Sequence, residues 1–113
     1  MKWNELKSVS QIGQIVDESN EKPILIFKYS SRCSISRLAL DRLERNWDES
    51  EMAHVTPYFL DLITYREISN GIADQFDVQH ESPQVLLIDK GKSIFDQSHL
   101  AIDYNAIKDA SSS

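Results

Sequence analysis

The chain has 113 residues and a mass of 13.0 kDa, with 41% hydrophobic and 27% charged residues. This composition predicts one globular domain over residues 1–110, followed by a flexible tail at 111–113. The net charge of −6 argues against nucleic acid or an anionic membrane surface as a partner, and no apolar run approaches the roughly 20 residues of a membrane span. One cysteine and three scattered histidines form no metal-ligand pattern, so we expect no metal site.

The first half of the chain predicts a short strand near residues 3–6 and a helix over 9–19, which Ser8 and Gln11 would cap. The continuous apolar run at 24–27 predicts a central strand that is buried on both faces. After it, an apolar stripe that begins at Ser34 predicts a helix of about fourteen residues. No apolar segment resembles a secretory signal, and a single cysteine forms no internal disulfide, so we expect a cytoplasmic protein.

The second half predicts an inner strand at 55–62, an amphipathic helix at 65–76 and a third strand at 85–88. A hairpin turn then leads to an antiparallel edge strand at 93–97 and to a helix that Asp103 caps. Because strands joined through helices run parallel, we expect only the hairpin to add an antiparallel strand. The result is an α/β fold with a central mixed sheet sandwiched by helices, which resembles a thioredoxin-like domain.

Cys33 is the only cysteine, and it lies between the central strand and the helix that follows. A helix N-terminus stabilises a thiolate, because its N–H groups are unpaired and carry the positive end of the helix dipole. The first 46 residues carry eight Lys and Arg against six Asp and Glu, whereas the rest carry four against twelve. We expect Lys28, Arg32 and Arg37 to lower the thiol pKa further. The alternative is a buried, inert cysteine.

Cys33 to Ser36 form a C-x-x-S pattern, in which a hydroxyl replaces the second sulfur of a dithiol motif. Ser36 is able to donate a hydrogen bond to the Cys33 thiolate, but it cannot resolve a mixed disulfide. An outside thiol must then complete any catalytic cycle. The alternative role for Ser36 is to cap the start of the helix.

Ser82 and Pro83 directly precede the third strand. In thioredoxin-like folds this loop faces the helix that carries the active cysteine, so we expect a cis Ser82–Pro83 bond that faces Cys33. His80 is either a proton shuttle or a loop histidine held by backbone groups. Lys28 either pairs with Asp61 or extends its ammonium group into solvent.

Residues 27–36, 66–69, 78–86 and 98–99 resemble the YtxJ-like monothiol bacilliredoxins, and the similarity spans almost the whole chain. The resemblance implies a thioredoxin fold and a nucleophilic cysteine, Cys33, that removes bacillithiol from S-bacillithiolated proteins. It implies no bound cofactor, with bacillithiol as a thiol co-substrate. Ser34 replaces the proline that usually follows the cysteine in this family.

The sequence therefore predicts a thiol–disulfide oxidoreductase in which Cys33 and Ser36 are catalytic. Substrate-binding residues would be Arg32, Ser34, Ser82 and Pro83. The expected partners are bacillithiol and S-bacillithiolated proteins. Another redoxin is a further candidate partner, which would regenerate Cys33. The alternative function is a non-catalytic thioredoxin-fold adaptor, or a sensor that is S-thiolated without turnover.

Overall fold

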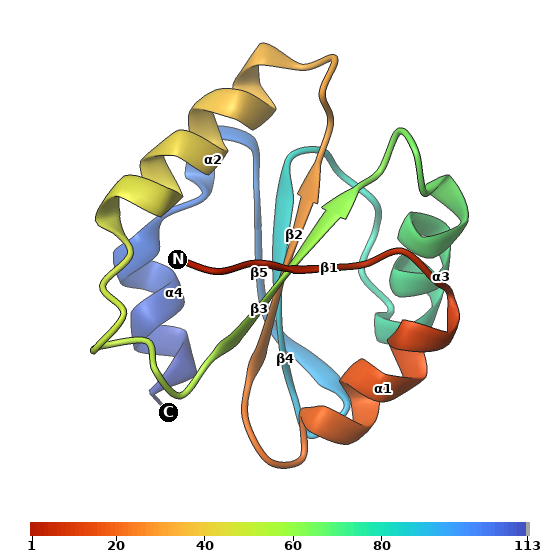
Figure 1. Cartoon of the computed structure of the whole chain (residues 1–113), viewed down its shortest axis with the longest axis horizontal. Helices are drawn as coiled ribbons and strands as arrows, with labels where there is room; N and C mark the ends of the chain where they lie inside the picture. The colour runs from red at the N-terminus through yellow and green to blue at the C-terminus, as the bar shows by residue number, and fades with distance from the viewer. Residues whose placement is uncertain (113) are drawn as a thin grey trace.

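A computed structural model describes residues 1–112 as a five-stranded mixed sheet with helices on both faces (Figure 1). The sheet order is β1-β3-β2-β4-β5, so β2 lies in the middle. This confirms the predicted α/β architecture. In chain order the elements are β1 (Asn4–Glu5), α1 (Ser10–Glu18), β2 (Ile24–Tyr29), α2 (Ser34–Asn46), β3 (Thr56–Asp61), α3 (Arg66–Phe76), β4 (Gln84–Asp89), β5 (Lys92–Ser98), the short 3-10 helix η1 (His99–Ala101) and α4 (Tyr104–Ser111).

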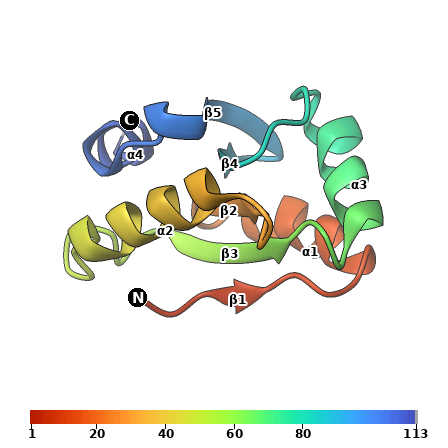
Figure 2. The same ribbon diagram turned by 90° about the horizontal axis from the view of Figure 1, so that it is seen from above.

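Each face of the sheet packs against its own pair of helices. Helices α1 and α3 cover one face, and α2 and α4 cover the other (Figures 1 and 2). Side chains alternate along β2, so Ile24 and Ile26 join the first core while Leu25 and Phe27 join the second. All four are fully buried, which explains why this strand is a continuous apolar run. No helix within residues 1–112 has the length and apolar character needed to cross a membrane.

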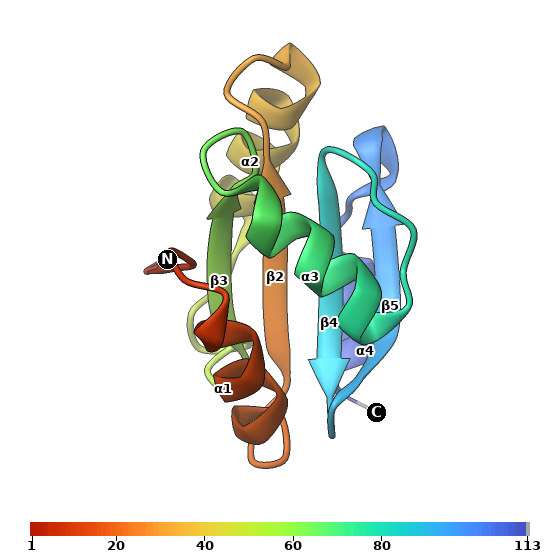
Figure 3. The ribbon, with the colours of Figure 1, turned by 90° about the vertical axis from the view of Figure 1, so that its right-hand side faces the viewer.

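The direction of β4 differs from the prediction. Strands β2 and β3 are parallel, but β4 is antiparallel to β2, with Lys28 opposite Gln84. The reason is the segment after α3. Asp77 ends that helix in the left-handed conformation, with φ of 54°, and residues 77–83 then return the chain to the end of the sheet where β2 finishes (Figure 3). The helix alone would have made β4 parallel.

One of the two predicted caps is present. The N-cap of α1 is Val9, and no side chain caps this helix, so the cap predicted at Ser8 is wrong. Ser8 and Gln11 instead form hydrogen bonds just before the helix: the side chain of Gln11 accepts from the N–H of Ser8 (2.9 Å), and Ser8 Oγ accepts from the N–H of Ser10 (3.3 Å). Asp103 caps α4 by accepting from the N–H of Ala106 (3.0 Å). The Asp103 cap depends on residues three apart in the chain, which is why the local sequence predicts it.

The predicted tail at 111–113 is wrong for Ser111. This residue lies in α4 and is buried, and its Oγ donates to the Lys108 carbonyl (2.8 Å) and lies 3.0 Å from Nε2 of His54. Ser112 is the C-cap of the helix. Ser113 lies outside the described residues.

Gly13 and Gly91 differ in backbone conformation, so an alanine at each should change stability in opposite directions. A Cβ added at Gly13, inside α1, meets nothing within 4 Å, whereas Gly91 in the β4–β5 turn has φ of 77°. We expect Gly13→Ala to raise the free energy of unfolding by about 1 kcal/mol, because alanine is the better helix former. Gly91→Ala should lower it by about 1 kcal/mol, because a Cβ strains the left-handed conformation. Urea unfolding measures both, and shifts of the same sign would contradict this assignment.

Candidate functional site

Cys33 lies at the start of α2, directly after the turn that follows β2. Its backbone is extended and forms the helix N-cap. The Cys33 N–H donates to the carbonyl of Ser30 (3.2 Å), and its own carbonyl accepts from the N–H groups of Ser36 (3.1 Å) and Arg37 (3.4 Å). The side chain is partly exposed. The thiol is therefore accessible and lies beside the first turn of a helix, as predicted.

The first turn of α2 lowers the pKa of the Cys33 thiol below its ordinary value. The N–H of Ser36 contributes most; burial opposes it, and the N–H of Ile35 and the hydroxyl of Ser36 lower the pKa further. Ser36 is fully buried, and its Oγ accepts from the N–H of Ser30 (3.3 Å). Its hydroxyl proton then remains to donate to the sulfur. This is the predicted direction for the pKa of Cys33.

The expected electrostatic cause of this shift is wrong. Arg32 and Arg37 are exposed, and neither contributes to the shift in the Cys33 pKa. Alternation along β2 turns Lys28 toward α3, where its Nζ donates to the carbonyl of Ser69 (3.2 Å). Hydrogen bonding at the helix start, and not the neighbouring cations, therefore favours the thiolate.

The loop that contains Ser82 and Pro83 lies at the same end of the sheet as Cys33. Strand β2 ends there and the antiparallel β4 begins there (Figure 1). The Ser82–Pro83 peptide bond is cis, as predicted. The carbonyl of Pro83 accepts from the N–H of His99 (2.9 Å), which ties the loop to the end of β5. Ser82 Oγ is buried and has no hydrogen-bond partner among residues 1–112.

Exposed apolar side chains lie on the two elements nearest this end. Ile35 and Leu38 are on α2, and Leu100, which is 56% exposed, is on η1. The two elements are in contact. Sequence reasoning missed Leu100 as part of this surface, because only the course of β5 brings η1 beside α2. No signal in the residues themselves indicates that neighbourhood.

Sequence reasoning also missed a buried polar cluster, which is formed by Lys28, Ser69 and His80 next to the loop of Ser82 and Pro83. Lys28 is 0% exposed, and its Nζ lies 3.4 Å from Nδ1 of His80, while Ser69 Oγ lies 3.1 Å from the same nitrogen. Burial lowers the pKa of Lys28 to about 8. Burial also lowers the pKa of His80, followed by the charge of Lys28. Both expectations for Lys28, an ion pair with Asp61 and extension into solvent, are wrong. The signal in the sequence that could have indicated this cluster is a lysine at the end of a central, apolar strand.

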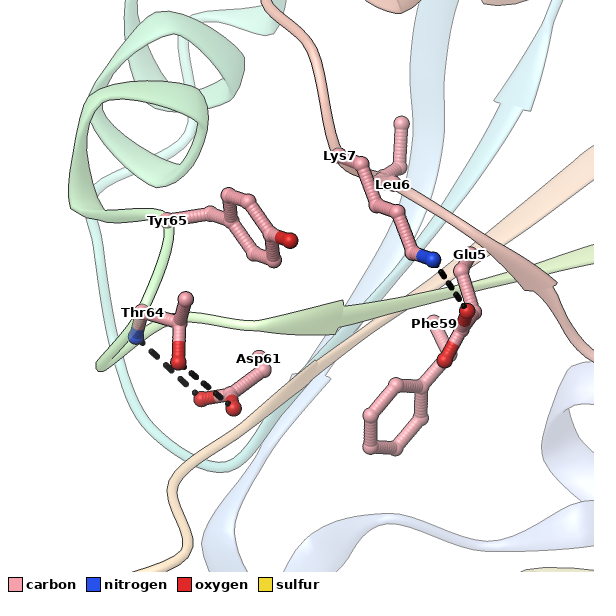
Figure 4. A pocket seen from close by; sticks show the side chains of 7 residues that line it. All are labelled: Glu5, Leu6, Lys7, Phe59, Asp61, Thr64 and Tyr65. Carbon is pink, nitrogen blue, oxygen red and sulfur yellow. Dashed lines mark hydrogen bonds and ion pairs between the residues drawn. The ribbon is translucent and has the colours of Figure 1, made fainter.

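A separate pocket of about 250 Å³ lies at the edge of the sheet, beside β1 (Figure 4). Its charged groups already have partners. Lys7 Nζ lies 3.1 Å from Oε2 of Glu5, and the carboxylate of Asp61 accepts from the hydroxyl (3.0 Å) and the N–H (3.4 Å) of Thr64. We therefore assign it no part in the site of Cys33. The lining residues are Glu5, Leu6, Lys7, Phe59, Asp61, Thr64 and Tyr65.

Comparison with known families matches residues 4–107 to the family described as "Monothiol bacilliredoxin BrxC". The chain belongs to this family. The match covers most of the chain, and the monothiol description agrees with its single cysteine. Membership in the monothiol bacilliredoxin family supports a thiol–disulfide redox role.

Solved structures show that the fold is the thioredoxin fold, as predicted. A structure described as "A putative oxidoreductase with a thioredoxin fold" has a TM-score of 0.79 and 28% identity, and the match covers 94% of this chain and 90% of that chain. Thioredoxin from Fasciola hepatica has a TM-score of 0.71 and 16% identity, with 96% of each chain covered. Thioredoxin from Malassezia sympodialis has a TM-score of 0.73 and 16% identity, with 98% of this chain and 89% of that chain covered.

The first prediction for the site concerns the reactivity of Cys33. We expect its alkylation rate to rise with a midpoint below about 8.5, the pKa of a free cysteine. Ser36→Ala should raise this midpoint, because it removes the hydroxyl that donates to the thiolate. Ser31→Ala, an exposed serine in the same turn, is the matched control and should leave it unchanged. Iodoacetamide kinetics against pH measure all three, and a wild-type midpoint at or above about 8.5 would favour the inert cysteine.

The second prediction concerns the stability effect of Lys28. Burial lowers its pKa from 10.5 to about 8, so between these values the unfolded chain binds more protons than the folded one. Wild-type stability therefore gains from this residue as the pH rises from 8 to 10.5. Near neutral pH we expect Lys28→Met to be more stable than wild type, by up to about 3 kcal/mol.

That difference should shrink as the pH rises toward and above 10.5, because the amine is then neutral in the folded state and increasingly neutral in the unfolded state. Urea unfolding of the two proteins near neutral pH and near pH 10.5 measures it. A variant that is less stable than wild type by the same amount at both pH values would show that the polar contacts of Lys28 outweigh the burial of its charge.

Proposed function

We propose that this protein removes bacillithiol from S-bacillithiolated proteins by thiol–disulfide exchange at Cys33. The observation that carries the proposal is the position of the single cysteine, which is partly exposed at the start of α2 and has a lowered pKa. Membership in the monothiol bacilliredoxin family supports bacillithiol as the small thiol. Sulfur exchange needs no bound cofactor, and bacillithiol acts as a co-substrate.

In the first step the Cys33 thiolate attacks the bacillithiol sulfur of the mixed disulfide. The bond between the client protein and bacillithiol breaks, and a bond between Cys33 and bacillithiol forms. The client cysteine leaves as a thiolate and takes a proton from water. The first-turn N–H groups and the hydroxyl of Ser36 favour the charged sulfur before attack.

In the second step an outside thiol regenerates Cys33, because Ser36 has no sulfur with which to resolve the adduct. A second bacillithiol thiolate attacks the bacillithiol sulfur of the adduct, and Cys33 leaves as a thiolate. The product is bacillithiol disulfide, so the number of disulfide bonds is conserved. Another redoxin is able to take the place of this second thiol. Because the cycle needs a pool of reduced thiol, we propose a cytoplasmic location.

The surroundings of Cys33 supply contacts for both parts of the substrate. The exposed Arg32 precedes the cysteine, so its guanidinium group would bind an anionic group of the thiol that is joined to Cys33. Ser34 is the first residue of α2, where an N–H has no partner within the helix. The loop with Ser82 and Pro83 would align the client chain, whose apolar side chains would meet Leu100 and its neighbours on α2.

The exchange prediction uses a peptide whose cysteine is joined to bacillithiol by a disulfide. We expect wild type to form a one-to-one bacillithiol adduct at Cys33 and to release it to reduced bacillithiol, as intact mass shows. Cys33→Ser should abolish exchange. Ser36→Ala should slow it about fivefold, the effect of about 1 kcal/mol from one hydrogen bond.

Ser36→Cys provides a positive control for the monothiol cycle. The new thiol, one helical turn from Cys33, should form an internal disulfide and expel bacillithiol, so the adduct should no longer accumulate. An adduct that forms without turnover in wild type would favour the sensor. Exchange that survives in Cys33→Ser, without any adduct in wild type, would contradict the proposed mechanism.

A further inference from the structure

Polar contacts from several elements hold the loop before β4, and three of them involve Gln79, Pro83 and His80. Gln84 Nε2 donates to the carbonyl of Gln79 (3.0 Å), and the N–H of His99 donates to the carbonyl of Pro83 (2.9 Å). Both contacts involve backbone groups of the loop. The third contact is made by an imidazole, because His80 directs Nδ1 at groups on β2 and α3. It is the only one of these three contacts in which the loop's own group changes charge near neutral pH.

The contacts of Nδ1 determine which ring nitrogen of His80 carries the proton. Nδ1 of His80 lies 3.4 Å from Nζ of Lys28 and 3.1 Å from Oγ of Ser69. An ammonium group only donates hydrogen bonds, so Nδ1 must accept and the ring proton must lie on Nε2. Lys28 is fully buried, and its other hydrogen bond is to the carbonyl of Ser69 (3.2 Å). The histidine is thus the link between a buried charge and the loop.

We propose that Lys28 is a positioning residue that acts through His80 to hold the loop of Ser82 and Pro83 where the substrate disulfide binds. This inference rests on the proposed function, and it adds a residue on the face of the sheet that α2 does not cover. Lys28 is fully buried on the α3 side and therefore acts through the histidine, without contact to the substrate.

The contact should depend on pH. The charged groups that act on His80 come from three elements: Lys28 from β2, Arg66 from α3 and Glu81 from the loop itself. The two cations lower the pKa of His80, and Glu81 raises it, with burial as the largest lowering cause. Protonation of Nδ1 removes the acceptor and places an imidazolium beside an ammonium, so the contact breaks at acidic pH. Above about pH 8 Lys28 loses its charge and donates more weakly.

The test compares two disulfides that differ in their need for the loop. One is a peptide joined to bacillithiol by a disulfide, and the other is dithiodipyridine, a small symmetric disulfide. The readout is the kcat/KM for the peptide divided by the kcat/KM for dithiodipyridine. This quotient cancels the fraction of Cys33 that is thiolate at each pH. In wild type we expect this quotient to be highest between the pKa values of His80 and Lys28.

Lys28→Met and His80→Gln should each lower this quotient about tenfold near neutral pH, through KM for the peptide, and should flatten its pH dependence. Reaction with dithiodipyridine should stay within about twofold of wild type. His54→Gln is the matched control, because His54 contacts Ser111 on α4 and should leave the quotient unchanged. His80→Gln keeps the test valid if Lys28→Met does not fold.

A second readout does not depend on catalysis. The imidazole of His80 should titrate at a higher pH in Lys28→Met than in wild type, as followed by NMR, because a neighbouring positive charge is removed. An unchanged quotient in both variants, or an equal loss toward both disulfides, would overturn the inference. A wild type that reacts with neither disulfide would instead contradict the proposed function.

Discussion

Strand β2 runs through the middle of the sheet, and residues 24–28 are fully buried between the two layers of helices. A backbone in that position must satisfy its N–H and carbonyl groups on both sides, which β3 and β4 provide. The chain leaves the sheet only where this strand ends, so the turn to α2 emerges there. The loop before β4 emerges at the same end, because β4 is antiparallel to β2. This pairing brings Cys33 and Pro83 to the same end of the sheet.

Short-range hydrogen bonds govern the thiol more than charge does. Arg32 and Arg37 are close in sequence to Cys33, but their side chains are exposed, where solvent and salt screen their fields. The N–H of Ser36 belongs to the same helical turn as the sulfur and is fixed in direction by α2. A fixed dipole in a partly buried place acts on the thiolate more strongly than a mobile, hydrated cation. A net-positive sequence neighbourhood is therefore a poor measure of thiol reactivity in this fold.

Lys28 connects the stability of the domain to its candidate chemistry. An ammonium group that is fully buried loses its hydration, and within residues 1–112 its partners are the carbonyl of Ser69 and the imidazole of His80. Most side chains of the α1 and α3 core are apolar, so the burial of this charge costs stability there. The same burial directs its donors at the loop beside Cys33. An apolar residue at this position would pack well and would leave that loop without its contact to β2.

The sequence by itself determined the elements and the position of the thiol. Apolar periodicity reports which faces of a segment are buried, so it predicted β2 as a central strand, α2 after it and Cys33 at their junction. The tertiary structure decided which faces and ends meet. The path of residues 77–83 reversed β4, and the same path placed His80 beside Lys28 and Ser69. These outcomes depend on contacts between residues far apart in the chain, and local periodicity carries no information about them.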